Sequence, residues 1–102
     1  MLELRPVCEN CGKALPPDST EARICSFECT FCANCVTNVL RNVCPNCGGG
    51  FELRPIRPAR NWRGDNFLAA YPASTQLCHR PVDPIAHSAL LREIEGVPPE
   101  KR

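Results

Sequence analysis

Residues 8–47 read CENCGKALPPDSTEARICSFECTFCANCVTNVLRNVCPNC, and the cysteine spacing in this stretch decides the fold. A tetrahedral zinc ion takes four sulfur or nitrogen ligands, and a Cys-x-x-Cys turn supplies two of them with little strain. Such turns recur here, so the sequence predicts two Zn²⁺ ions, each held by four thiolates. The candidate ligands are Cys8, Cys11, Cys25, Cys29, Cys32, Cys35, Cys44 and Cys47.

A disulfide framework is the competing interpretation, because small cysteine-dense chains are often secreted and oxidised. Residues 1–6 lack the basic start and the apolar run of a signal peptide. No later stretch approaches the roughly 18 apolar residues that a membrane helix needs. We therefore expect a reducing cytoplasmic location, no membrane association, and metal binding in preference to disulfides.

The composition divides the chain near residue 54: the clustered cysteines come before it, and seven of the eleven prolines come after it. At about 50 residues, buried apolar area roughly cancels chain entropy, so a structural metal must supply the difference. We predict a small metal-stabilised α+β fold with three parts. These are a two-zinc module at 1–54, an extended connector at 55–82 and a C-terminal helix at 83–96.

Two helices and two strands are predicted within this division. Apolar residues recur with the helical period after Cys35, which predicts a short amphipathic helix over 33–41 with its amino end against a thiolate site. Asp83 as N-cap, Pro84 at the first position and Gly96 as terminator frame the final helix. Its apolar stripe is Leu90, Leu91 and Ile94.

Residues 2–7 and 51–56 both alternate apolar with polar side chains and repeat the pattern Glu-Leu-Arg-Pro. This period is typical of strands. We expect two short strands that lie near each other and face one core. The residues facing that core are Leu2, Leu4, Phe51 and Leu53.

The eight cysteines form four pairs, and four pairs make two sites in three ways. A nested scheme would crowd the second and third pairs around one ion within eleven residues, which leaves little chain to turn between them. A sequential scheme, first pair with second and third with fourth, is sterically reasonable. An interleaved scheme, first with third and second with fourth, is equally so.

The stretch Phe31-Cys32-Ala33-Asn34-Cys35, preceded by Cys29 and followed by Cys44-Pro45-Asn46-Cys47, resembles the second half of a RING finger. Where most RING fingers have a histidine ligand, this chain has Cys29. The resemblance implies a RING-like cross-brace with a treble-clef-type helix. It places Cys8, Cys11, Cys32 and Cys35 on one zinc, and Cys25, Cys29, Cys44 and Cys47 on the other.

Over its whole length the chain also resembles a bacterial family of small cysteine-rich proteins known as a domain of unknown function, the DUF1272 type. Residues 17–25, 42–51 and 71–75 carry this resemblance. This resemblance implies metal binding in a bacterial cytoplasm and says nothing about a substrate.

Eight thiolates for two ions leave no open coordination position, so we expect structural zinc in a non-enzymatic protein that binds a protein partner. A RING-type ubiquitin-ligase adaptor is one alternative. The resemblance disfavours it, because Glu9-Asn10 and Gly48 stand where such ligases usually carry an apolar residue and a cation.

Nucleic-acid binding is a second alternative. Prolines in an extended connector would set arginines spaced every third residue along one edge, with Trp62 available to stack on a base. Those arginines are Arg54, Arg57, Arg60 and Arg63. A third metal site has weaker candidates, which are Cys78, His79 and His87.

Metal storage or redox sensing is a further alternative for the thiolate groups, because oxidation of the thiolates would eject zinc.

Overall fold

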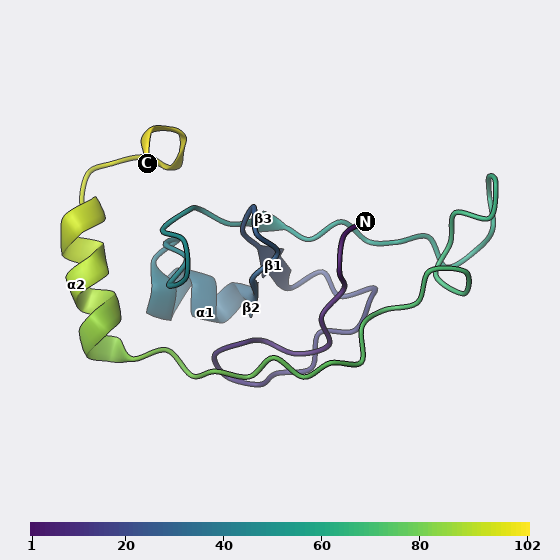
Figure 1. Cartoon of the computed structure of the whole chain (residues 1–102), viewed down its shortest axis with the longest axis horizontal. Helices are drawn as coiled ribbons and strands as arrows, with labels where there is room; N and C mark the ends of the chain where they lie inside the picture. Colours follow the sequence, from purple (N-terminus) through teal and green to yellow (C-terminus); the bar gives the residue numbers. More distant parts are fainter.

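The computed structural model describes all residues, 1–102, and its centre is a three-stranded antiparallel sheet (Figure 1). The strands are β1 (Ala22–Ile24), β2 (Thr30–Cys32) and β3 (Glu52–Leu53), in the order β2-β1-β3. Ala22 pairs with Cys32, and Arg23 pairs with both Phe31 and Leu53. The sheet therefore carries cysteines at the end of each strand of the β1–β2 hairpin.

A short helical segment follows β2 without a linker. It begins as α1 (Ala33–Cys35) and continues as a wider π-helical turn, η1 (Val36–Leu40). This confirms the helix predicted over 33–41. The segment ends where Arg41 adopts a left-handed conformation, with φ of 52°.

The core is small, and half of its twelve clustered residues are cysteines. Phe31 and Phe51 meet edge to face, with ring centroids 5.4 Å apart. The remaining apolar members are Leu15, Ala22, Val36 and Leu40. A core this rich in sulfur agrees with the expectation that aliphatic burial alone does not supply the folding free energy.

The predicted strand at residues 2–7 is wrong. Only an isolated bridge, Val7 with Ala14, forms there, and β3 pairs with β1 instead. The carbonyls of the N-terminal segment accept from arginine side chains and loop amides rather than from a neighbouring strand. The two segments do lie together, because Leu4 is buried and lines a small hollow with Leu2 and Ile56. Leu53, however, is 51% exposed and faces away from the core.

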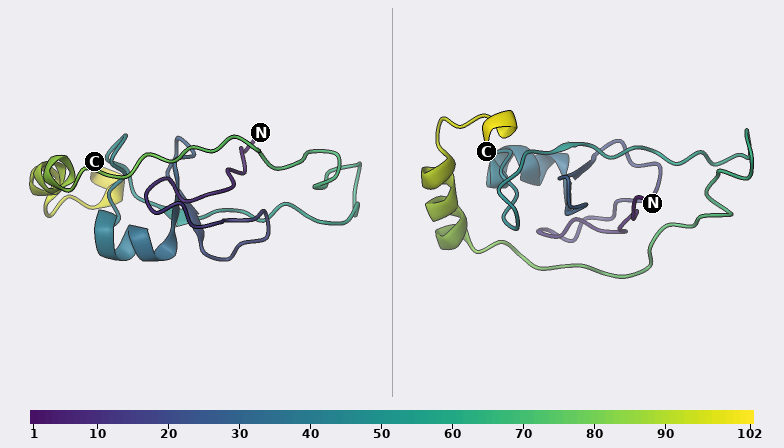
Figure 2. Two further views of the ribbon diagram at one scale, coloured as in Figure 1. Left: turned by 90° about the horizontal axis from the view of Figure 1, so that it is seen from below. Right: turned by 45° about the horizontal axis from the view of Figure 1, so that its top comes forward.

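The connector runs away from the sheet after β3, turns in a distal loop, and returns along the opposite side of the module to α2 (Figures 1 and 2). This excursion makes the molecule long, with extents of 46 × 27 × 18 Å. The radius of gyration is 14.7 Å, against about 13 Å for a compact domain of this length. Much of residues 55–82 is therefore extended chain, as the sequence predicts.

The C-terminal helix α2 (Pro84–Ile94) has Asp83 as its N-cap, whose side chain accepts from the Ile85 amide at 3.0 Å. Gly96 follows it with φ of +78°. The capping signals in the sequence therefore placed this helix correctly. A 3₁₀ turn, η2 (Pro99–Lys101), follows. None of the helices combines the length and apolar content that crossing a bilayer requires.

Candidate metal centre

The first cysteine group joins the loop at Cys8 to the start of the helix. The four sulfurs of Cys8, Cys11, Cys32 and Cys35 all lie within 4.8 Å of one another. The Cys11 and Cys32 sulfurs are 3.8 Å apart. A tetrahedral ion with metal–sulfur bonds of about 2.3 Å requires sulfur–sulfur separations of about 3.8 Å. The group thus has the dimensions of a tetrahedral four-thiolate metal site.

The second group joins the β1–β2 turn to the loop after η1. The sulfurs of Cys25, Cys44 and Cys47 lie within 4.8 Å of one another. The Cys29 thiol interacts with those of Cys25 and Cys44 and completes the set of four. Both groups offer soft sulfur donors alone, a set that suits zinc and does not suit magnesium or calcium.

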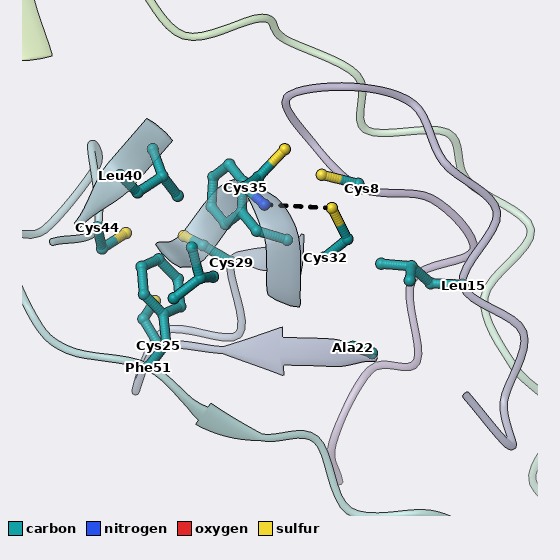
Figure 3. Packing of buried hydrophobic residues seen from close by; sticks show 12 residues of the cluster. Cys8, Leu15, Ala22, Cys25, Cys29, Cys32, Cys35, Leu40, Cys44 and Phe51 are labelled. Carbon is teal, nitrogen blue, oxygen red and sulfur yellow. Dashed lines mark hydrogen bonds between the residues drawn. The ribbon is translucent and has the colours of Figure 1, made fainter. Parts of the chain in front are cut away.

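The structure brings the four pairs together in the interleaved way, first with third and second with fourth. Figure 3 shows the sulfurs of Cys8 and Cys32 facing each other beside α1, while Cys25, Cys29 and Cys44 gather towards Phe51. The sequential scheme is therefore wrong. Strand β2 links the groups covalently, because it follows directly after Cys29 of the second group and ends at Cys32 of the first.

Nitrogen donors surround the sulfurs of both groups. In the first, the Cys35 amide donates to the Cys32 sulfur at 3.5 Å, as predicted for the helix amino end (Figure 3). In the second, the Phe27 and Gly49 amides donate to the Cys25 and Cys47 sulfurs at 3.3 and 3.4 Å. Such donors stabilise the negative charge that four thiolates leave on a divalent ion.

Two asparagine side chains complete this set, and the sequence analysis missed them. Asn10 donates to the Cys35 sulfur at 3.3 Å, and Asn46 donates to the Cys29 sulfur at 3.4 Å. The signal in the sequence was an asparagine directly before a cysteine. That signal is imperfect, because Asn34 precedes Cys35 in the same way yet bonds only to Asn38.

Burial controls the protonation of the thiols. It raises the pKa of Cys35 to about 12 and raises the pKa values of Cys29 and Cys44 as well. Each of these thiols is therefore protonated at neutral pH when no metal is bound. A metal ion must displace those protons to form thiolates, so binding and proton release are coupled.

The loop between Cys8 and Cys11 also holds the returning connector. The Arg80 amide donates to the Glu9 carbonyl at 2.7 Å, and the Arg80 guanidinium lies 3.2 Å from the buried Glu9 carboxylate. The Val82 amide donates to the Asn10 side-chain oxygen at 2.9 Å. Asn10 thus contacts a first-group sulfur with its nitrogen and the connector with its oxygen.

Replacing Asn10 with alanine will loosen the connector where it contacts the first cysteine group. Both side-chain hydrogen bonds are lost, and each contributes about 1 kcal/mol. We expect faster hydrogen–deuterium exchange at residues 79–83 in Asn10→Ala, measured on the metal-loaded protein by mass spectrometry. Asn34→Ala is the matched control, since that side chain bonds only within the helix. Equal exchange in the two variants would contradict the role of Asn10.

The four connector arginines do not form the single basic edge that was predicted. Arg54 is 1% exposed and donates to the carbonyls of Arg5, Leu15 and Pro16. Arg57 donates to the carbonyls of Leu2 and Tyr71. Only Arg60 and Arg63 are exposed, beside the 71% exposed Trp62 in the distal loop. Two of the four cations are therefore committed to the fold.

The structure does not bring together Cys78, His79 and His87, the weaker candidates for a third metal site. The His79 ring bonds to the Asn10 carbonyl at 3.1 Å, and the His87 ring bonds to the Leu40 carbonyl at 2.9 Å. These histidines serve different contacts, and neither joins Cys78 in a group of metal-binding side chains. His87 is instead the buried residue that fastens α2 to the end of η1.

Comparisons with known proteins find a family and a relative that match this chain. The sequence profile of a family described as "Protein of unknown function (DUF1272)" matches residues 1–57. An uncharacterized protein of Rhizobium meliloti (strain 1021) is 53% identical over 81 residues, which cover 79% of this chain and 89% of that protein. No solved structure matches the chain. The similarity thus covers both cysteine groups and, in the relative, part of the tail.

Proposed function

Since the chain belongs to the DUF1272 family and its cysteines form two compact groups, we propose that it is a non-catalytic zinc protein that binds a protein partner. Two Zn²⁺ ions would be held by the two groups, as the donor set favours. The ions supply folding free energy, and the surface of the folded chain supplies recognition. The reducing cytoplasm is the compartment in which these thiols stay free to bind metal.

The closure of both groups is the observation that carries this proposal. A catalytic zinc keeps one position open for water or substrate, whereas four protein ligands fill a tetrahedral ion. Three of the four cysteines in each group are buried, with Cys11 and Cys47 exposed. Four thiolates would leave each ion no open coordination position, which supports a structural role.

The proton balance of metal binding tests the all-thiolate coordination. A thiol has an ordinary pKa of about 8.5, and burial raises it further at Cys29, Cys35 and Cys44. Below that range each bound ion will release about four protons, so affinity will rise about 10⁴-fold per pH unit between pH 6 and 7. Titration calorimetry in buffers of different ionisation enthalpy measures the count. Release of fewer than about three protons per ion would contradict four thiolates.

The interaction part of the proposal is tested with tagged, metal-loaded protein in lysate of the native host. Full-length protein is compared with a chain truncated after Arg57, which keeps the contacts of Arg54 and Arg57 with residues 1–16. We expect at least one protein retained by the full-length chain at near-stoichiometric amounts. Recovery of the same protein by both would place recognition on the zinc module. Recovery of none by either would contradict a partner-binding function.

A ubiquitin-ligase role has less support. Glu9 lies inside the first Cys-x-x-Cys turn, and it is 3% exposed and paired with Arg80. Gly48 follows the last candidate ligand and is buried against Ile94. The two positions that usually hold a conjugating enzyme in such ligases are therefore turned inward. This argument favours the non-enzymatic proposal.

A further inference from the structure

A groove lies between α2, the end of η1 and the C-terminal turn. Its volume is about 800 Å³. The apolar side chains Leu91, Ile94 and Val97 line it, and all three are half-buried. We call this the α2 groove. Its size lies in the range of pockets that bury several side chains of a bound segment.

The groove exists because α2 is held to the zinc module at few points. One side-chain hydrogen bond, from His87 to the Leu40 carbonyl, fastens its first half. Its second half packs Ile94 against Gly48, where a β-carbon would lie 3.2 Å from the isoleucine methyl. Part of the helix's apolar stripe is thus covered by the module, and Leu91 remains partly open to solvent.

Three arginines surround this apolar floor: Arg41, Arg92 and Arg102. Arg102 is occupied, since its guanidinium donates to the carbonyls of Asn42, Gly48 and Val97. Arg41 and Arg92 are exposed, and the ion pairs of the protein all involve other residues. Glu95 is the one acidic side chain in the lining. Two free cations therefore flank an apolar surface.

This local positive charge contrasts with the rest of the molecule. The formal net charge is +1 with neutral cysteines, and two zinc–tetrathiolate sites would bring it to about −3. The net negative charge of the metal-loaded molecule repels an acidic partner, whereas the arginines of the α2 groove attract it. An acidic partner is therefore expected to bind at this groove rather than elsewhere on the surface.

The backbone at Arg41 gives an independent reason to assign the cation a role. Arg41 and Asn42 both have left-handed conformations, with φ of 52° and 59°. Glycine is the residue that ends a helix in this conformation without strain. The Arg41 side chain makes no hydrogen bond or ion pair within the chain, so the fold does not require an arginine here.

We propose that the α2 groove binds an acidic amphipathic helix of the partner protein. The apolar side chains of that helix pack on Leu91, Ile94 and Val97, and its carboxylates pair with Arg41 and Arg92. The proposal rests on the proposed function, because it names the surface and the chemistry of that partner. Nucleic acid fits this groove less well, since its lining contains no aromatic side chain on which a base can stack. An amphipathic helix buries apolar residues in a groove of this kind.

The test uses the full, zinc-loaded chain and a fluorescent peptide of about 14 residues with Leu at i, i+3, i+4 and i+7 and Glu elsewhere. Binding is measured by fluorescence anisotropy, and the site by amide chemical shifts. We expect shifts at 91–97 and binding that weakens with salt. Arg41→Gly with Arg92→Glu will weaken it at least about tenfold, whereas Arg60→Glu with Arg63→Glu, equally exposed but distant, will not.

Several outcomes would contradict the proposal that the α2 groove binds an acidic helix. These are equal binding by the double variant, equal binding of a peptide with Lys in place of Glu, or shifts at 91–97 caused by single-stranded DNA but not by the acidic peptide. The same double variant is used in the lysate experiment. A host protein retained equally by it and by the wild type would leave the proposed function standing and remove this surface from it.

Discussion

A chelator will unfold residues 1–57 of the reduced, natively purified protein, and added zinc will restore them. Six of the twelve core residues are cysteines that belong to the two groups, so the core has no apolar substitute for the ions. Each zinc contributes on the order of 10 kcal/mol to folding, so the two ions together exceed the roughly 5–15 kcal/mol by which a typical domain is stable. Mass spectrometry measures the loss of metal, and the dispersion of amide signals in NMR spectra measures the unfolding.

The chain contains a matched control for this experiment. Cys44→Ser removes a fully buried sulfur from the second group, whereas Cys78→Ser removes a half-buried thiol outside both groups. We expect the first variant to lose metal and dispersed amide signals, and the second to keep two ions and its fold. A well-dispersed spectrum after complete loss of metal would refute the structural role of the ions.

Replacing Arg54 with methionine will destabilise the fold by removing a buried guanidinium. The guanidinium is buried without a carboxylate partner, and burial lowers its pKa. Its stabilising contacts are three backbone carbonyls from the N-terminal segment and the loop at 15–16. Methionine fills similar space but leaves the Arg5 and Leu15 carbonyls without donors, at a cost of about 2 kcal/mol or more. The Pro16 carbonyl keeps the Ser19 amide as its donor.

Urea unfolding of the zinc-loaded protein measures this loss, with Arg60→Met as the control because Arg60 is exposed. Arg54→Lys keeps the charge but not the planar set of donors, and we expect its stability to lie between methionine and wild type. Equal urea midpoints for Arg54→Met and Arg60→Met would contradict this prediction. They would mean that the free-energy cost of burying the Arg54 charge equals the stabilisation from its hydrogen bonds.

The parts predicted correctly from the sequence are those with a strong local signal. Cysteine spacing revealed both metal-binding groups, because tetrahedral thiolate coordination restricts how ligands are spaced. Asp83, Pro84 and Gly96 placed α2, because a helix end needs particular backbone donors and conformations. Spacing alone did not decide between sequential and interleaved pairing. The resemblance to RING fingers implied the interleaved pairing that the structure has.

The errors concern residues whose partners lie far away in the chain. Strands β1 and β2 have three residues each, too few for a period-two pattern to be recognised. Arg54 was placed along one edge of the connector because the arginines recur every third residue, yet its acceptors are 38 to 49 residues earlier. Asn10 and Asn46 were missed because a sulfur acceptor in another segment cannot be inferred from a single position.

The interleaved pairing sets an order of assembly during synthesis on the ribosome. The first group is complete once Cys35 has emerged, and the second only after Cys47. Between these points the nascent chain can capture one ion while Cys25 and Cys29 still wait for their partners. A half-metallated chain is therefore the intermediate expected under zinc shortage, with the four thiols of the second group still open to oxidation.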